Sequence, residues 1–190
     1  MADDVGLRLA APQDGWQGRP DMEPAQTARV RASIVARARF IEDLVCEQAE
    51  LGVGQYVILG AGLDSFAQRR PEMAGRLRVF ELDQPEPQAW RRQRFAELGL
   101  SAPDGLLFVP VDFEGDWWGR LIDAGFDPAR PAVVVSTGVV MYLTRAAVET
   151  TLDRVAALAA GSSFVVTFLL PLTLVEPEEK AMRAATEQCA

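Results

Sequence analysis

Short unbroken apolar runs alternate along the chain with longer stretches whose apolar residues recur three and four positions apart. The unbroken runs lack a polar and apolar alternation, which predicts strands that are buried on both faces. These strands are expected at 55–60, 76–83, 105–113, 131–138 and 162–170. The stretches with helical spacing predict helices at 24–51, 85–100, 117–126, 145–160 and 176–188.

Strands that alternate with helices predict an α/β, Rossmann-like fold, with a mostly parallel sheet and helices on both faces. Thr144 is expected to cap the helix over 145–160. Residues 1–23 are polar and contain glycine and proline, which predicts a flexible N-terminal arm before a single domain over 24–190. Sheets of this kind bind ligands beyond the carboxyl ends of their strands, so the residues just after each strand are the candidates for a site.

Composition narrows the classes of function. The 190 residues include 19 Lys and Arg against 27 Asp and Glu, and this net charge of −8 argues against binding to nucleic acid or to an anionic membrane surface. No apolar run is long enough to span a membrane, the N-terminus lacks signal-peptide features, and Cys46 and Cys189 lie far apart, so a cytoplasmic protein is expected. The absence of histidine excludes serine–histidine and cysteine–histidine catalysis and histidine-ligated metals, and no metal site is expected.

Three consecutive strands end in residues that suit a bound adenosine. The candidates are Gly60, Ala61, Gly62 and Asp64 after the first strand, Asp83 and Gln84 after the second, and Asp112 and Phe113 after the third. Taken singly, the glycines are explained by a turn and each acid by a helix cap or turn. Together they indicate a ligand site, because glycines let the backbone approach a ligand, Asp83 can accept both ribose hydroxyls, and Asp112 with Phe113 can hold the adenine.

The residues after the glycines indicate which adenosine cofactor fits. The dinucleotide fingerprint G-x-G-x-x-G needs a third glycine at the position of Ser65. Asp64 would also repel the pyrophosphate of NAD, since both are negatively charged. S-adenosyl-L-methionine has no phosphate and carries an ammonium group, so an acid beside the glycines suits it better.

Five short sequence motifs occur in a fixed order along the chain. They are RARFIEDLV, VILGAGLDSFAQR, VFELDQPE, VPVDF and STGVVMYLT. Together they resemble the leucine carboxyl methyltransferase family, including its bacterial polyketide O-methyltransferase relatives, over roughly residues 28–180. The resemblance implies a class I methyltransferase fold and S-adenosyl-L-methionine as the cofactor.

The resemblance also implies roles for single residues. Arg37 matches the arginine that holds the methionine carboxylate, with Arg39 as the second choice and a solvent-facing helix position as the ordinary explanation. The matched cofactor residues are Gly60, Gly62, Asp83, Asp112 and Phe113. Glu81 is expected to point elsewhere or to orient the loop.

The chain departs from the family pattern in two places. Thr137 stands where family members often have glutamate, so its contact to the methionine part is expected to be weaker or to use the backbone. Family members usually continue past this point into two strands that close the sheet. Their absence predicts a domain that is C-terminally truncated, whether as a shortened chain, a natural fragment or a divergent short member. The open sheet edge would then need a partner to cover it, such as a second copy of the chain.

The expected function is an O-methyltransferase that acts on a carboxylate or hydroxyl of a polyketide-like small molecule or on a protein C-terminus. A carboxylate acceptor needs no base, in keeping with the lack of histidine, and no catalytic residue is identified. Tyr142 either points toward the acceptor or packs at a helix start. The alternatives are a non-catalytic or regulatory methyltransferase domain, which the missing strands favour, and a nicotinamide oxidoreductase, which Asp64 and Ser65 disfavour.

Overall fold

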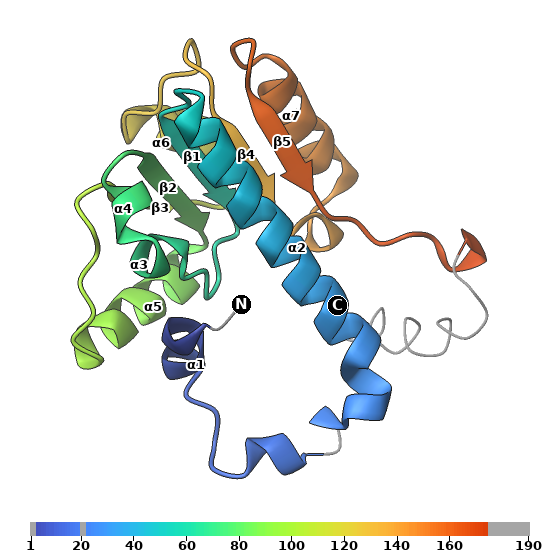
Figure 1. The fold of residues 1–190 in the computed structure, drawn as a ribbon. Coiled ribbons are helices and arrows are strands. Elements are labelled where there is room, and N and C mark those ends of the chain that lie inside the picture. The colour runs from blue at the N-terminus through green and yellow to red at the C-terminus, as the bar shows by residue number, and fades with distance from the viewer. Residues whose placement is uncertain (1–2, 20–21, 175–190) are drawn as a thin grey trace.

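Five parallel strands form one sheet in the computed structural model, and helices cover both of its faces (Figure 1). The structure describes residues 3–19 and 22–174. The strands are β1 (Gln55–Leu59), β2 (Arg78–Asp83), β3 (Leu106–Pro110), β4 (Val133–Ser136) and β5 (Ser163–Val166). All five predicted strands are present, each shorter than its apolar run, and the predicted α/β fold is confirmed.

The strand β1 lies at the centre of the sheet. The strand order is β3-β2-β1-β4-β5, so the chain first builds one side of β1 and later returns to build the other. Tyr56 of β1 is in register with Val79 on one side and with Val133 on the other. The order therefore reverses between β1 and β4, and the crevice beyond the carboxyl ends of these two strands is where such sheets bind ligands.

The longer helices agree with the sequence pattern. They are α2 (Pro24–Glu50), α5 (Pro85–Glu97), α6 (Trp117–Asp123) and α7 (Arg145–Ala156). Thr144 caps α7 as predicted, because its hydroxyl accepts a hydrogen bond from the Ala147 N–H (3.3 Å). The helix predicted over 176–188 lies outside the described residues. In the part of the chain that the structure describes, no helix is long and apolar enough to cross a membrane.

Several short elements were not predicted by the sequence pattern. They are the helices α3 (Phe66–Arg69) and α4 (Pro71–Ala74) and the 3-10 turns at Trp16–Gly18, Val140–Tyr142 and Leu172–Leu174. A single turn is too short to show a hydrophobic repeat. Of these elements α3 matters most for the site, because it begins just after residues 60–65, the loop that contains Gly60 and Gly62.

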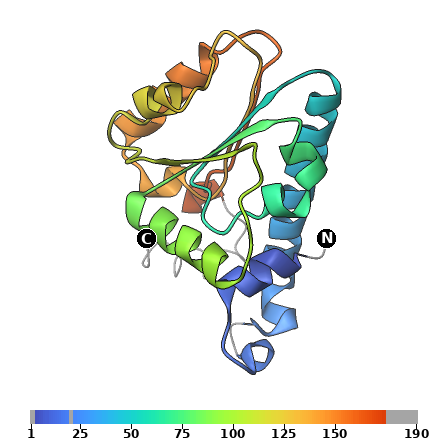
Figure 2. The same ribbon diagram turned by 90° about the vertical axis from the view of Figure 1, so that its left-hand side faces the viewer.

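Each face of the sheet has its own hydrophobic core, because successive side chains of a strand point to opposite faces. Tyr56 and Ile58 of β1 belong to the same core as Val45 of α2, whereas Val57 and Leu59 belong to the core that includes α6. Figure 2 shows the layers, with α2 on one side of the sheet and α6 and α7 on the other. The two cores fix the sheet and therefore the positions of the strand ends.

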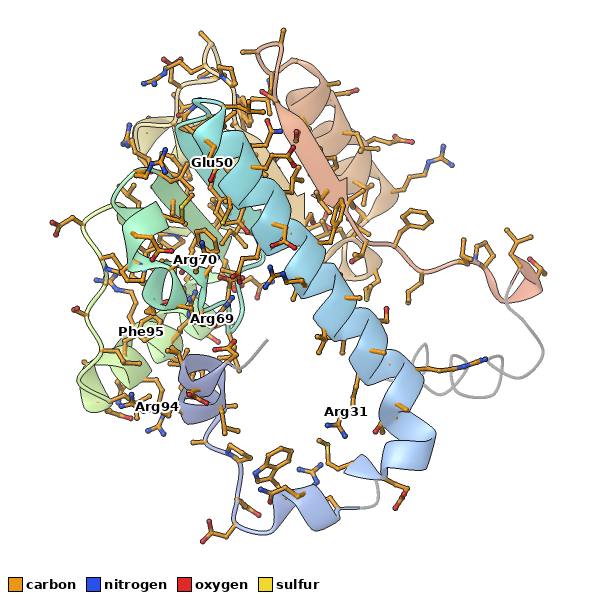
Figure 3. The ribbon with its side chains drawn as sticks, in the orientation of Figure 1. Arg31, Glu50, Arg69, Arg70, Arg94 and Phe95 are labelled. Carbon is orange, nitrogen blue, oxygen red and sulfur yellow. The ribbon has the colours of Figure 1, made fainter. Side chains whose placement is uncertain are left out.

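The N-terminal segment differs from the flexible arm that the sequence led us to expect. Asp4–Ala10 form a helix, α1, which Asp3 caps, and Leu9 is fully buried. Arg94 of α5 donates a hydrogen bond to the Arg8 carbonyl (3.3 Å), and Figure 3 shows Arg94 beside α1. A seven-residue helix with one buried leucine gives no repeat, which is why the pattern did not reveal it.

Candidate functional site

Two adjoining pockets lie at the carboxyl edge of the sheet. The first, called the α2 pocket, is lined by Ile34, Arg37, Ala38, Ile41, Glu42, Tyr56, Ile58, Gly60, Ala61, Asp64, Phe66, Arg69, Val135 and Thr137. The second, called the Asp83 pocket, is lined by Gly60, Gly62, Asp83, Gln84, Asp112, Phe113, Glu114, Gly138, Val139, Tyr142 and Leu143. Gly60 lines both, so the two pockets meet at the first residue after β1.

Every residue that the sequence singled out as a first choice for cofactor contact lines one of these pockets, and the second choice, Arg39, lines neither. The α2 pocket has Arg37, Ala61, Asp64 and Thr137, the Asp83 pocket has Gly62, Asp83, Gln84, Asp112 and Phe113, and both share Gly60. The residues come from α2 and from the loops after four different strands. The fold therefore brings together the residues that were chosen from separate strand ends.

Gly60 stands where two loops come into close contact. Its φ is +73°, and a Cβ atom built on it would lie 2.3 Å from Cγ2 of Val139, which follows β4. A side chain at this position would meet both backbone strain and a clash. The glycine is therefore required by the close approach of the β1 and β4 loops, which form the junction between the pockets.

The glycine loop, residues 60–65, is tied to the end of β2. The N–H groups of Gly60 and Ala61 both donate to the Leu82 carbonyl (2.8 and 3.0 Å). The Gly62 N–H donates to Oδ2 of Asp83 (2.7 Å), and Oδ1 of Asp83 accepts from the Gln84 N–H (2.8 Å). Each carboxylate oxygen has two lone pairs, so Asp83 keeps acceptor capacity toward the pocket that it lines.

The loop after β3 forms the far wall of the Asp83 pocket. Asp112 is exposed and accepts a hydrogen bond from the Glu114 N–H (3.0 Å). Phe113 is buried and packs against Trp117, with ring centroids 6.3 Å apart, so much of its ring belongs to the core. Glu114, which the sequence did not single out, accepts hydrogen bonds from both the backbone N–H and the hydroxyl of Thr144 (2.7 Å each), and so joins this wall to α7.

Asp64 and Glu81 are two acids with different surroundings. Oδ1 of Asp64 accepts the Phe66 N–H (2.8 Å) at the start of α3, and burial raises the pKa of Asp64 although that hydrogen bond and nearby arginines oppose the shift. Glu81 lines neither pocket and is fully buried against Arg91 of α5. Burial raises the pKa of Glu81 to about 7, against the opposing charge and hydrogen bonds of Arg91.

The two candidate arginines of α2 differ in their partners. Arg37 lines the α2 pocket and is half-buried, and among the described residues its guanidinium has no hydrogen bond or ion pair. Arg39 is exposed, pairs with Asp43 one turn along (2.8 Å), and lines neither pocket. The geometry therefore favours Arg37 as the residue able to hold an anionic group in the α2 pocket.

A charged cluster that the sequence did not reveal lies partly in the wall of the α2 pocket. Glu42 of α2 accepts hydrogen bonds from Arg69 (2.6 Å) and Arg70 (3.0 Å), which Figure 3 labels beside α2. Burial alone would raise the pKa of Glu42, but these two hydrogen bonds and charges bring it below its usual range. The cluster links α2 to α3, and two of its members, Glu42 and Arg69, line the α2 pocket.

The remaining candidates flank the end of β4. Thr137 is half-buried in the α2 pocket, and the N–H of the next residue, Gly138, donates to Oγ1 of Thr167 (2.9 Å). Tyr142 lines the Asp83 pocket and is 66% exposed, so it is not packed at a helix start. Within the described residues no cluster of three or more acidic or cysteine side chains could hold a metal ion.

Comparisons of sequence identify related proteins. The sequence profile of the leucine carboxyl methyltransferase family matches residues 1–156. A protein of Mycolicibacterium smegmatis is 37% identical over 161 residues, which cover 84% of this chain and 53% of the relative. A protein of Frankia alni is 41% identical over 165 residues, which cover 83% and 57%. Both carry the provisional name of S-adenosyl-L-methionine-dependent methyltransferase, and the chain spans about half the length of the curated relatives that it matches.

Solved structures share the fold. The S-adenosylmethionine-dependent methyltransferase SibL, in its apo form, is similar with a TM-score of 0.50 at 18% identity over 97% of this chain and 48% of SibL. An O-methyltransferase family protein from Burkholderia thailandensis gives a TM-score of 0.50 at 17% identity over 90% of this chain and 51% of that protein. At these identities the likeness concerns the arrangement of the sheet and helices.

Proposed function

The chain belongs to the leucine carboxyl methyltransferase family, and on this premise we propose that it binds S-adenosyl-L-methionine across the two pockets and transfers the methyl group to an oxygen atom. The observation that carries the proposal is the pair of pockets that meet at Gly60 and that together are lined by every first-choice contact residue. An extended ligand with one end in each pocket would pass Gly60, where the close approach of Val139 leaves no space for a side chain in the protein itself.

The polar groups of the two pockets suit the two ends of this cofactor. In the Asp83 pocket, Asp83 would accept the ribose hydroxyls, and exposed Asp112 would accept the adenine amino group. In the α2 pocket, the unpaired guanidinium of Arg37 would hold the methionine carboxylate, and Asp64 would face the ammonium group. Thr137 is close enough to the same end to offer its hydroxyl or its backbone.

For methyl transfer the protein mainly has to bind the cofactor and the acceptor and to orient them. S-adenosyl-L-methionine supplies a methyl group that is already activated by its sulfonium charge. Transfer to a carboxylate needs no general base, which agrees with a chain that has no histidine. The residues of the pockets would hold the methyl group in line with the acceptor and keep water away from it.

We propose a carboxylate or hydroxyl of a small molecule, polyketide-like in its chemistry, as the acceptor, with a protein C-terminus as the other carboxylate that fits. Carboxylates and phenols can be separated by pH. A carboxylate acceptor is already anionic at pH 6, whereas transfer to a phenol, whose pKa is near 10, should speed up as pH rises from 6 to 9.

Titration calorimetry with S-adenosyl-L-homocysteine and with NAD tests the proposal. We expect binding of S-adenosyl-L-homocysteine and no heat from NAD, because Asp64 and Ser65 replace the features that a pyrophosphate needs. Binding of NAD alone would contradict the proposal. Binding of S-adenosyl-L-homocysteine without any transfer of labelled methyl to carboxylate or hydroxyl acceptors would instead support a non-catalytic domain.

A further inference from the structure

We propose that Arg91 of α5 is a positioning residue that fixes the glycine loop, and through it the shape of the junction between the pockets. The inference rests on the proposed cofactor site, because it assigns a second anchor to the loop that this site uses. Neither Arg91 nor its partner Glu81 lines a pocket, so their part would be indirect.

Arg91 is held in one orientation by its surroundings. It is 2% exposed, and both of its terminal nitrogens donate to the fully buried carboxylate of Glu81, Nη1 to Oε2 and Nη2 to Oε1 (3.0 Å). Its guanidinium carbon lies 5.0 Å from the ring centre of Phe95 and 5.8 Å from that of Phe108. A side chain with two charged contacts and two ring contacts has little freedom to turn.

The same guanidinium reaches the glycine loop. Nη2 of Arg91 also donates to the backbone carbonyl of Asp64. Asp64 is the last residue before Ser65, the N-cap of α3, and its own carboxylate accepts the Phe66 N–H. Arg91 therefore fixes the place where the loop ends and α3 begins.

Both ends of the loop are thus anchored to β2. The start of the loop is held by the Leu82 carbonyl and by Asp83, which accepts the Gly62 N–H. The end is held by Arg91, whose partner Glu81 lies two residues before Asp83. Residues two apart on a strand face the same side, so one face of β2 holds the loop directly through Asp83 and indirectly through Glu81 and Arg91.

A buried ion pair could instead serve only the core. Such pairs can often be replaced by apolar residues without loss of stability, so their presence alone does not indicate a role in a site. The contact that distinguishes the two explanations is the hydrogen bond to the Asp64 carbonyl. Lysine could still neutralise Glu81, but a single ammonium lacks the planar fork that spans the carboxylate and the carbonyl together.

Two variants distinguish the effect of the Glu81–Arg91 ion pair from the effect of the hydrogen bond between Arg91 and the Asp64 carbonyl. We expect Arg91→Lys to keep a cooperative unfolding transition and to bind S-adenosyl-L-homocysteine at least fivefold more weakly than the wild type. The double variant Glu81→Leu with Arg91→Met removes both charges and keeps an apolar core, and it should weaken binding similarly. Arg78→Lys is the matched control, because Arg78 donates to the carbonyls of Gly125 and Ala124 at the other end of β2, and its affinity should stay at the wild-type value.

Hydrogen exchange gives a second measurement that needs no cofactor. Loss of the Arg91 contact should speed exchange of the Gly62 and Phe66 amides at least fivefold, while amides in the middle of β1 keep their protection. A wild type that fails to bind S-adenosyl-L-homocysteine would overturn the proposed function, and exchange at the loop would still decide the role of Arg91. Wild-type affinity together with wild-type loop exchange in either folded variant would show that Arg91 serves only the core.

Discussion

Among single residues, the acids at the end of β2 show how position decides chemistry. Glu81 and Asp83 share a face of the strand, but Glu81 is fully buried, whereas Asp83 is half-exposed at the edge of a pocket. A buried carboxylate loses its water and its pKa rises unless a partner compensates. Glu81 is therefore suited to holding Arg91, and Asp83 is free to meet a ligand.

We expect Asp83→Asn to weaken binding of S-adenosyl-L-homocysteine about tenfold or more. Both carboxylate oxygens already accept backbone N–H groups, from Gly62 and Gln84, and an asparagine would turn its NH₂ toward one of these donors. Loss of a hydrogen bond to a charged group costs about 1.5–3 kcal/mol, and about 1.4 kcal/mol is tenfold in affinity. Calorimetry checks this, with Asp116→Asn, a cap of α6 that lines neither pocket, as the control. Equal affinities for the Asp83 variant and wild type would remove Asp83 from the site.

Arg37 and Arg39 make a matched pair for the other end of the cofactor. Arg37→Ala should weaken binding of S-adenosyl-L-homocysteine about tenfold or more, because it removes a charge-assisted contact to the carboxylate. Arg37→Lys should also bind more weakly than wild type, since lysine lacks the fork. Arg39→Ala should bind like the wild type, because Arg39 is exposed and paired with Asp43. The reverse pattern, measured by the same titration, would assign the contact to Arg39.

The buried Glu81 carboxyl beside Arg91 predicts that the stability of the fold changes with pH in one direction. Burial raises the pKa of Glu81 from its ordinary 4.5 to about 7, so the folded chain holds this proton more tightly than the unfolded chain. The free energy of unfolding should then fall as pH rises from about 4.5 to 7. The variant Glu81→Gln cannot titrate, so the stability of the wild type relative to it should decrease over this range in urea unfolding. A relative stability that increases with pH would show that Arg91 keeps Glu81 ionised throughout.

The positions of the longer helices and of the strands could be predicted from the sequence, because a buried helix or strand needs apolar residues at a regular spacing or in an unbroken run. The run at 131–138 contains β4, and Thr144 caps α7, because a continuous apolar run and a hydroxyl before a helix are local signals. The strand ends then gave the candidate contact residues, which line the two pockets. The hydrogen bonds and ion pairs between residues far apart in the sequence have no such local signal.

The arginines around the pockets are the clearest case of what could not be predicted. Arg91 and Arg69 are two of 19 basic residues, and nothing in their neighbours distinguishes them from charges on a solvated helix face. Their partners Glu81 and Glu42 lie 10 and 27 residues away in the sequence. Only the packing of α5 on the sheet and of α3 against α2 brings these charges together.

The bridge between the β3 loop and α7 predicts a measurable loss of stability. Thr144→Val removes the cap of α7 and the hydroxyl bond to Glu114, and we expect it to lower the free energy of unfolding by about 1 kcal/mol. Thr144→Ser keeps the hydroxyl and should stay close to the wild type. Urea unfolding of the three chains checks this, and equal stability of the valine variant would show that the bridge contributes nothing.

At the scale of the whole molecule, the sheet has a well-packed centre and, among the residues that the structure describes, an open edge at β5. Among the described residues β5 pairs only with β4, and its other side presents backbone N–H and C=O groups without strand partners. The residues of β5 are half-buried, unlike the fully buried residues of β1 and β4. Unpaired edges of this kind favour association between copies of a chain.

We therefore expect the 190-residue chain to associate with itself through the β5 edge. Apolar side chains follow that strand, with Phe168 65% exposed and Leu170 41% exposed, so backbone pairing and apolar burial would act at the same place. A charge placed there should oppose both, and Phe168→Glu should lower the association of the chain in sedimentation experiments over a range of concentrations. Trp90→Glu is the matched control, because Trp90 is 51% exposed on α5, which follows β2 toward the opposite edge of the sheet. If both variants associate as the wild type does, the contact lies elsewhere, and a wild type that stays monomeric at every concentration would show that the open edge is already protected.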